Sequence, residues 1–157
     1  MVVGTWIQRY IKDDVDQLGN ENSKYTMDIV GFVTPDSAIP KEGKATYKGL
    51  SIYGSDPYDN MSLTYNVDFT TRKGSGYLTD GRAQTYYGAK INLNSGDITK
   101  VNIKGTDLIG ISSTAQSLNN IKGDYKIGFY GTEAQDIAGT LNIPTSTYGS
   151  TEVEYGL

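Results

Sequence analysis

The sequence predicts an all-β fold: an antiparallel up-and-down β-barrel of about eight strands that follows an N-terminal strand hairpin. Thirteen tyrosines, 19 glycines and only four prolines among 157 residues suit pleated strands joined by tight turns. Between Met61 and Phe69 every second residue is apolar, which is the period of a strand with one face in a core. Segments rich in Gly, Asn, Asp and Ser separate the strand-like stretches, so most connections are predicted to be hairpins.

Ten segments show this alternation, some of them weakly. They are residues 3–11, 25–33, 44–53, 61–69, 88–93, 101–103, 107–112, 125–130, 137–143 and 152–157. Their separators, among them LGNENS, GSDPYDN, RKGSG and LNSGD, consist of residues that accept the backbone angles of turns. Helix is predicted only as a short turn at residues 114–119. Closing a run of antiparallel strands removes their exposed edges, which favours a barrel over an open sheet.

The domain organisation is predicted to be simple. Residues 1–157 form one domain, with leading strands in 1–31 and the barrel in 32–157. A chain of this length buries enough surface to fold without a disulfide. The rival fold is an immunoglobulin-like sandwich, which is less favoured because the chain is long for it and lacks the Cys, Trp, Cys spacing.

Composition excludes several classes of function. The chain has neither histidine nor cysteine, which removes the usual proton shuttle, the thiol nucleophile and the commonest zinc ligands. Neighbouring acidic residues such as Asp13, Asp14 and Asp16 have the pattern of a solvated turn and lack the spacing of a calcium loop. We therefore predict no enzymatic activity, catalytic residue, metal or cofactor. A net charge of −4 also argues against nucleic acid as a partner.

Tyrosines in turn-like contexts are the candidate contact residues. They are Tyr53, Tyr58, Tyr86, Tyr87, Tyr130 and Tyr148. Tyrosine offers a large, stiff and amphipathic contact at small entropic cost, so it is enriched in loops that recognise proteins. The alternative is that these rings are ordinary strand residues that pack on the barrel. Both interpretations are compatible with the sequence.

Several small residues are predicted to shape the barrel. Gly49 offers the missing Cβ that a sharp bend or bulge requires. In FYGTEAQDIAG, Gly131 is predicted to take the positive φ of a turn, with Ala134 tucked under the hairpin. Gly128 and Gly139 are predicted to let neighbouring strands bend or pack closely. These residues are interpreted as determinants of the fold, not as ligand contacts.

Three segments carry a resemblance to a known family. They are FVTPDSAIPKEGKATYKG at residues 32–49, LTYNVDFTTRKGSGYL at 63–78 and GDYKIGFYGTEAQDIAGTLNI at 123–143. In order and spacing they resemble the C-terminal β-barrel of the transferrin-binding protein B and factor H-binding protein family of bacterial surface lipoproteins. The resemblance extends from about residue 32 to the C-terminus.

The resemblance implies a binding domain on the surface of a bacterial outer membrane. Such a domain captures a host protein, transferrin-like or complement factor H-like, and is held by a lipid anchor that is absent from these residues. We expect it to be a monomer. In the factor H binders two acidic residues of the barrel contribute to the contact, and the matching positions here are Ile121 and Pro144, so this mode of capture is not implied.

Two alternatives remain at this point. Some relatives of this barrel act in haem acquisition, and a tyrosine could ligate ferric haem, although a barrel of this size is usually filled by its own side chains. A structural docking domain of a larger receptor is also compatible with the sequence.

Overall fold

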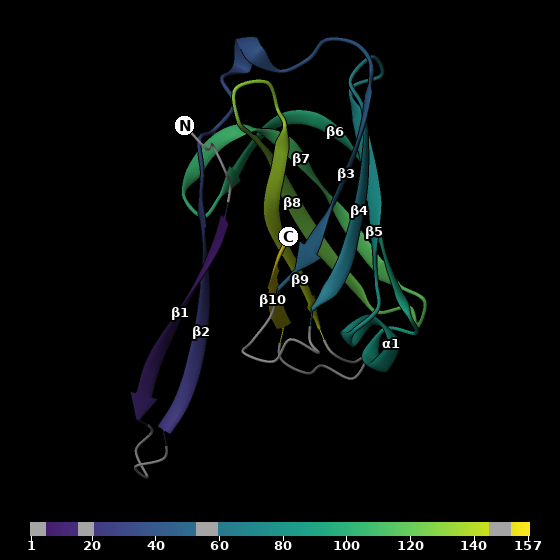
Figure 1. Cartoon of the computed structure of the whole chain (residues 1–157). Helices are drawn as coiled ribbons and strands as arrows, with labels where there is room; N and C mark the ends of the chain where they lie inside the picture. The colour runs from purple at the N-terminus through teal and green to yellow at the C-terminus, as the bar shows by residue number, and fades with distance from the viewer. Residues whose placement is uncertain (1–5, 16–20, 53–59, 145–151) are drawn as a thin grey trace.

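The computed structural model describes residues 6–15, 21–52, 60–144 and 152–157, and their secondary structure is almost entirely antiparallel strand. Two strands form an N-terminal hairpin. Eight further strands form one sheet, in which every strand lies beside its neighbour in the sequence (Figure 1). The predicted all-β fold, an up-and-down barrel of about eight strands with a leading hairpin, is confirmed.

The hairpin consists of β1 (Trp6–Val15) and β2 (Glu21–Val30). The barrel strands are β3 (Lys44–Ser51), β4 (Met61–Asp68), β5 (Lys73–Thr79), β6 (Lys90–Ile103), β7 (Thr106–Ser117), β8 (Lys122–Tyr130), β9 (Asp136–Pro144) and β10 (Glu152–Gly156). Two short helical segments are η1 (Asp36–Ala38) and α1 (Arg82–Tyr86). None of the helices in the described part of the chain is long and apolar enough to cross a membrane.

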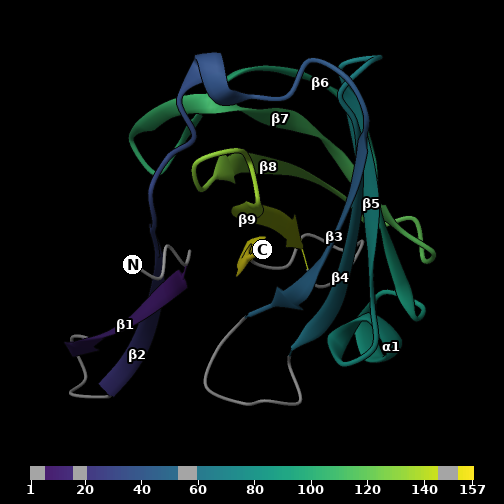
Figure 2. The same ribbon diagram turned by 45° about the horizontal axis from the view of Figure 1, so that its top comes forward.

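The sheet curls until its two edge strands, β3 and β10, approach each other (Figure 2). Among the described residues they are joined by one antiparallel bridge, between Ile52, directly after β3, and Gly156 of β10. These two residues exchange backbone hydrogen bonds of 2.9 and 3.0 Å. Because β10 has five residues and β9 has nine, the bridge closes the barrel at one level. A seam remains between β3 and the first residues of β9.

The barrel interior is filled by alternate residues of the strands. In β4 the side chains of Met61, Leu63, Tyr65 and Val67 are buried, while the residues between them are half-buried or exposed. This confirms the alternation predicted from the sequence. The core continues through Leu78, Ile91, Leu93, Ile111, Ile127, Phe129 and Leu141, each at most 1 % exposed. Burying a side chain of this kind contributes about 1.5–3 kcal/mol to stability.

The two helical segments cover the two ends of the barrel (Figure 1). Ile39, which follows η1, belongs to the core cluster at one end. At the other end α1 contributes Ala83. Tyr87, the residue after the helix, belongs to the same cluster. Neither barrel end is therefore an open mouth at these positions.

A β-bulge in β6 directs a backbone group into the core. The pairing of β6 with both neighbouring strands shifts register between Leu93 and Ile98, where one extra residue is accommodated. Within this stretch the carbonyl of Asn94 accepts a 2.6 Å hydrogen bond from the hydroxyl of Tyr125. The hydroxyls of Tyr125 and Tyr65 are 2.9 Å apart. The hydroxyl proton of Tyr125 is donated to Asn94, so Tyr65 donates to Tyr125. Both buried hydroxyls therefore have a hydrogen-bond partner.

Several local predictions were wrong. The segment RKGSG, predicted as a turn, lies mostly in β5, and LNSGD, predicted as a separator, lies inside β6. Gly74 and Gly96 face each other across these strands, and a Cβ on either would come within 2.6 or 2.7 Å of Ile111. These glycines make room for a core side chain, a role that local sequence does not distinguish from a turn.

The predicted helical turn at residues 114–119 was also wrong, because β7 continues to Ser117 and the short helix lies at α1. Gly49 pairs regularly with Leu63, and a Cβ there would meet nothing within 4 Å, so it marks neither a bulge nor a close approach. By contrast, Gly131 has the predicted positive φ, +89°. The close packing predicted at Gly128 and Gly139 is confirmed.

Candidate functional site

The tyrosines predicted to contact a partner do not form one surface in the described part of the chain. Tyr53, Tyr58 and Tyr148 lie outside the described residues. Tyr86 is 43 % exposed, whereas Tyr87 and Tyr130 are 0 % and 4 % exposed. The binding role of all six stays a prediction, and among the three described rings only that of Tyr86 presents a large surface to solvent.

Tyr86 is the last residue of α1 and Tyr87 follows it, but their side chains lie in opposite environments. Tyr87 packs in the barrel core, and its backbone amide donates to the carbonyl of Ala83. The rings of Tyr86 and Tyr87 have centroids 6.4 Å apart, within the range of aromatic pairs. Tyr87 thus fixes the end of α1 to the barrel, and Tyr86 is held beside it with an exposed ring.

The turn between β7 and β8 lies against α1 and carries a second exposed apolar residue. Leu118 is 57 % exposed, and its amide donates to the carbonyl of Tyr87 at 3.1 Å. The side chain of Asn119 donates to the carbonyl of Tyr86 at 3.2 Å. Tyr86 and Leu118 therefore belong to two segments that are hydrogen-bonded together. We call this pair of residues the α1 tip.

Tyr130 occupies a small apolar cluster on the outer face of the barrel. Its ring packs with Val101, Ile103, Leu108 and Ala138, and Ile29 and Val33 pack against the same group. Val33 forms an antiparallel bridge with Tyr130. Burial, followed by the nearby charge of Asp28, raises the pKa of Tyr130 to about 12. Tyr130 therefore serves to attach the chain that leaves β2 to the outside of the barrel.

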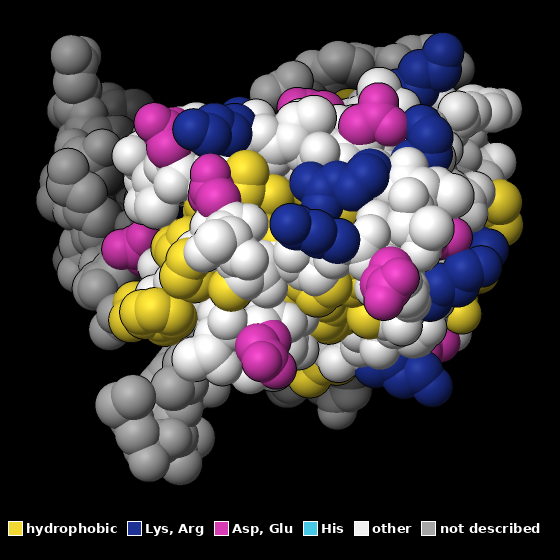
Figure 3. All heavy atoms as spheres, turned by 90° about the horizontal axis from the view of Figure 1, so that it is seen from above, with side chains coloured by type: hydrophobic (Ala, Val, Ile, Leu, Met, Phe, Trp, Pro, Cys, Tyr) yellow, Lys and Arg dark blue, Asp and Glu magenta, His cyan; other side chains and the backbone are white. Residues whose placement is uncertain are grey.

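Apolar residues are exposed at the η1 end as well. Val30, the last residue of β2, and Phe32 are 47 % and 51 % exposed. Figure 3 shows this end of the molecule, where apolar side chains lie between Lys, Arg, Asp and Glu side chains of both signs. The mixture of charges is typical of a protein-contact rim and does not resemble a phosphate-binding surface.

The seam between β3 and β9 forms the larger of two surface clefts that we describe. Its volume is about 690 Å³, and it is bordered by β3, by the start of β9 and by Leu157. On the β3 side Lys48 and Leu50 point outward and are exposed, Leu50 by 56 %. On the β9 side the cleft is lined by Asp136, Ile137 and Ala138.

Tyr47 spans this seam from β3. Its hydroxyl donates a 2.6 Å hydrogen bond to the carbonyl of Ala134, in the turn before β9, and its ring lies 6.5 Å from that of Phe129. Burial, followed by the charge of Asp136, raises the pKa of Tyr47 to about 12. β3 is thus joined to the turn before β9 by this side chain, and to β10, the neighbour of β9, by the Ile52–Gly156 bridge.

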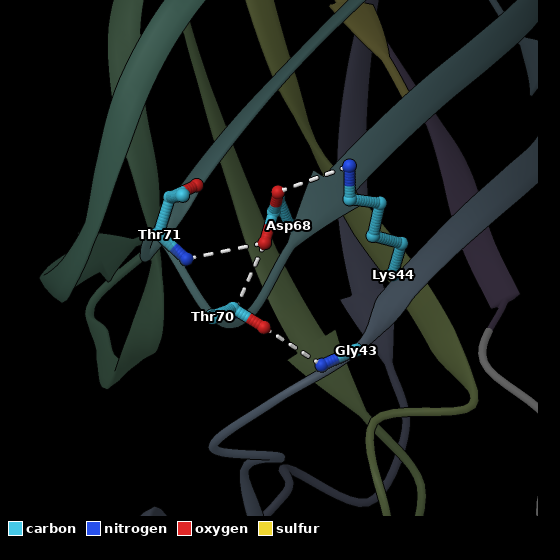
Figure 4. A network of polar contacts seen from close by, with 5 residues as sticks. All are labelled: Gly43, Lys44, Asp68, Thr70 and Thr71. Carbon is cyan, nitrogen blue, oxygen red and sulfur yellow. Dashed lines mark hydrogen bonds and ion pairs between the residues drawn. The ribbon is translucent and has the colours of Figure 1, made fainter.

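The outer face of β3, β4 and β5 is polar and forms the second cleft, of about 370 Å³. Asp68 organises one end of it (Figure 4): its carboxylate accepts hydrogen bonds from the amides of Thr70 and Thr71 and pairs with Lys44 at 3.4 Å. The amide of Thr71 is the main cause that lowers the pKa of Asp68. These contacts build the β4–β5 turn, and an exposed pair of this kind adds little to stability.

The described residues contain no group of three or more Asp or Glu side chains that could hold a metal ion. The positions matched to acidic contacts in the factor H binders differ in burial. Ile121 is 4 % exposed and lies in the core, and Pro144 is half-buried at the end of β9. Neither position therefore offers a carboxylate for such a contact.

Sequence reasoning missed Leu118 and the seam residues Lys48, Leu50 and Ile137. The alternation of residues 44–53 and 137–143 indicates which of these side chains point outward, but it does not reveal that β3 is an edge strand. Leu118 lies in a segment that was predicted to be helical, so the sequence did not place it in an exposed turn.

One comparison with known proteins gives a family. Residues 37–141, more than half of the chain, match the family model described as factor H binding protein, C-terminal. The matched region begins in η1 and ends within β9, so it contains most of the barrel and both walls of the seam.

Proposed function

The chain belongs to the factor H binding protein C-terminal family, and from this membership we propose that it is a non-enzymatic domain that captures a host protein. The match across the barrel strands is the observation that carries the proposal. The partner is a complement factor H-like protein, since that is the ligand in the family's name, and a transferrin-like protein is the second choice from the sequence resemblance. We also propose that the domain is displayed on the outer membrane of a bacterium through a lipid anchor.

The α1 tip is our proposed contact within the described residues. Tyr86 and Leu118 are a large aromatic and a large aliphatic side chain, 43 % and 57 % exposed, on two segments that are hydrogen-bonded together. Affinity in protein interfaces comes mainly from a few such anchors surrounded by polar contacts. Tyr53, Tyr58 and Tyr148 remain proposed contacts on the basis of the sequence alone.

The test is binding of purified factor H, and separately of whole host plasma, to the immobilised domain at physiological salt. We expect Tyr86→Ala and Leu118→Ala each to weaken factor H binding about tenfold, or about 1.4 kcal/mol. Tyr77→Ala is the matched control, because Tyr77 lies half-buried on the outer face of β5, under Lys90.

The outcomes separate the parts of the proposal. If factor H is not retained but another plasma protein is, capture of a host protein stands and the partner changes. If the domain retains nothing from plasma above a blank surface, the capture function is wrong. If Tyr77→Ala weakened factor H binding as much as Tyr86→Ala and Leu118→Ala, the α1 tip would not be the contact.

The haem hypothesis receives no specific support. Tyr65 and Tyr125, two of the phenols inside the barrel, are hydrogen-bonded to each other, and Tyr125 is also hydrogen-bonded to the carbonyl of Asn94. Ile111, Ile127 and Phe129 fill the surrounding core and are fully buried. We therefore advance capture of a host protein as the function.

A further inference from the structure

The turn between β5 and α1 contains the only Asp–Gly pair of the sequence, Asp80 and Gly81. Asp80 is exposed and has a positive φ of 66°, which aspartate accepts more readily than most residues. Gly81 has a φ of 48° and a ψ of −126°, a combination that favours glycine because glycine has no Cβ. The turn therefore places a glycine directly after an exposed aspartate.

An aspartate that precedes a glycine has a reaction available to it within its own main chain. The carboxyl carbon, Cγ, lies within reach of the amide nitrogen of the next residue, and a bond between these two atoms closes a succinimide ring. A side chain on the next residue hinders this approach, and a hydrogen bond donated by its amide holds the nitrogen away. Gly81 has no side chain, so the first obstacle is absent.

The second obstacle is absent as well. Within the part of the chain that the structure describes, the amide of Gly81 donates no hydrogen bond, and the carboxylate of Asp80 has neither a hydrogen bond nor an ion pair. Asp97 provides the contrast, because its carboxylate pairs with Lys73 at 2.6 Å. The residue after it, Ile98, is β-branched, and its amide donates at 2.9 Å to a carbonyl in the turn before β5.

We propose that Asp80 is a site of spontaneous isomerisation to isoaspartate. The nitrogen of Gly81 forms a bond to Cγ of Asp80, and one carboxyl oxygen leaves as water with the amide proton and a proton from the solvent. Water then opens the succinimide at either of its carbonyls and returns the proton. Cleavage between nitrogen and Cγ restores aspartate, whereas cleavage between nitrogen and the main-chain carbonyl leaves the chain running through Cγ. Water is the only co-reactant, and no electrons are transferred.

Isomerisation changes the start of α1. The main-chain carbonyl of Asp80 accepts a hydrogen bond of 2.9 Å from the amide of Ala83, whose side chain is fully buried in the core cluster. In isoaspartate this carbonyl becomes a carboxylate beside the chain, and a methylene group is inserted into the main chain, so the acceptor is displaced. Ala83 in turn accepts the amide of Tyr87, and the ring of Tyr87 lies beside that of Tyr86. The modification therefore loosens α1.

The proposed function gives this change a consequence, because Tyr86 belongs to the α1 tip. A domain that carries isoaspartate at residue 80 is expected to bind factor H more weakly than the fresh domain. Binding at the α1 tip would then decline with the age of the protein. This consequence rests on the proposed function, whereas the reaction at Asp80 does not.

Incubation of the domain in water labelled with heavy oxygen tests the reaction. Each opening of the succinimide adds a labelled oxygen at residue 80, whichever product forms, and mass spectrometry of peptides follows the label over several weeks at neutral pH. We expect the label to enter at Asp80 at least about tenfold faster than at Asp97, because the amide after Asp97 must first lose its hydrogen bond.

Asp80→Glu is the matched control. It keeps the carboxylate but would have to close a larger ring, so it should gain no label at this rate, and thermal melting would show that it is folded. Protein isoaspartyl methyltransferase, which methylates isoaspartate and not aspartate, should modify the aged wild-type domain at residue 80. The aged Asp80→Glu domain should stay unmodified there.

NMR hydrogen exchange measures the effect on α1 without any partner. In the isomerised domain the amide of Ala83 should exchange at least about tenfold faster than in the fresh domain, because its acceptor is displaced. The amide of Ile127, in the middle of β8, serves as the internal reference and should not change. Factor H binding of the aged wild type should fall in proportion to its isoaspartate content, while the aged Asp80→Glu domain keeps its binding.

Two results would overturn the inference. One is entry of the label at Asp80 no faster than at Asp97 in the folded wild-type domain. The other is unchanged exchange of the Ala83 amide in the isomerised domain, which would show that residue 80 does not control α1. A fresh domain that does not bind factor H would contradict the capture function and leave both of these measurements intact, so the two proposals can fail separately.

Discussion

The hydroxyl of Tyr47 lies 2.6 Å from the carbonyl oxygen of Ala134, 87 residues later in the chain. Tyr47 belongs to β3, the first strand of the barrel, and Ala134 to the turn before β9. This hydrogen bond joins β3 to the turn before β9, and the Ile52–Gly156 bridge joins β3 to β10. Four predictions follow from this closure and from the core behind it.

Removing the Tyr47 hydroxyl is expected to weaken barrel closure. Tyr47→Phe keeps the ring against Phe129 but leaves the carbonyl of the buried Ala134 without this donor. An unsatisfied buried acceptor costs about 1–3 kcal/mol, and urea unfolding should show a loss of that order. Tyr77→Phe, on the outer face of β5, should change stability by less than about 0.5 kcal/mol. Equal effects of the two substitutions would contradict the assigned role of Tyr47.

Stability should fall steeply as the pH rises above the ordinary tyrosine range. The pKa values of Tyr47 and Tyr130 are raised from 10.0 to about 12 in the folded protein. Between these values the unfolded chain has lost phenolic protons that the folded protein keeps, so the free energy of unfolding decreases with pH. This contribution is complete below about pH 10 and disappears as the pH passes through about 12.

Urea unfolding at pH 9 and pH 11.5 would measure this dependence. Tyr47→Phe removes one of the two phenols, so the wild type should lose more stability over this interval than the variant. The two proteins share every other side chain, so all other contributions cancel in the comparison. Parallel loss in the two proteins would show that Tyr47 does not hold its proton as we describe.

Tyr65 and Tyr125, the hydrogen-bonded pair of phenols inside the barrel, should behave as one unit. Tyr125→Phe removes the group that accepts from Tyr65 and donates to Asn94, so it leaves two polar groups unsatisfied and should cost about 1–3 kcal/mol. Once Tyr125 is phenylalanine, the further change Tyr65→Phe removes an unpaired buried hydroxyl and should cost little. A double-mutant cycle would detect this coupling, and strictly additive effects would contradict the hydrogen-bonded chain.

Two glycines of the barrel should respond oppositely to alanine. A Cβ at Gly110 would press on the backbone carbonyl of Ile127 and approach Val101 to 2.7 Å, and overpacking of this kind costs about 1–3 kcal/mol. A Cβ at Gly49 would meet nothing within 4 Å, so Gly49→Ala should be neutral or stabilise by up to about 1 kcal/mol through the unfolded state. Thermal unfolding of both variants provides the comparison, and a destabilised Gly49→Ala variant would show that β3 depends on that glycine.

The fold class and the strands with strong alternation could be predicted from the sequence alone. Met61 to Val67 could be assigned because a period of two places every apolar side chain on one face, and this signal is local. The positive φ of Gly131 was also predictable, because the residues of a turn are a local signal. The absence of histidine and cysteine, also a property of the sequence, removes imidazole and thiol chemistry.

Which residues share a surface could not be predicted from the sequence, because it depends on how distant strands pack. Tyr86 and Tyr87 are adjacent in the sequence, yet α1 packs one ring into the core and leaves the other exposed. Gly74 and Gly96 suggested turns, whereas their spacing from Ile111 shows that they clear space in the core. The closeness of β3 and β10 at Ile52 and Gly156 depends on pairing across most of the chain. Such edges are set by strand order and register, which are non-local, so no window of the sequence contains them.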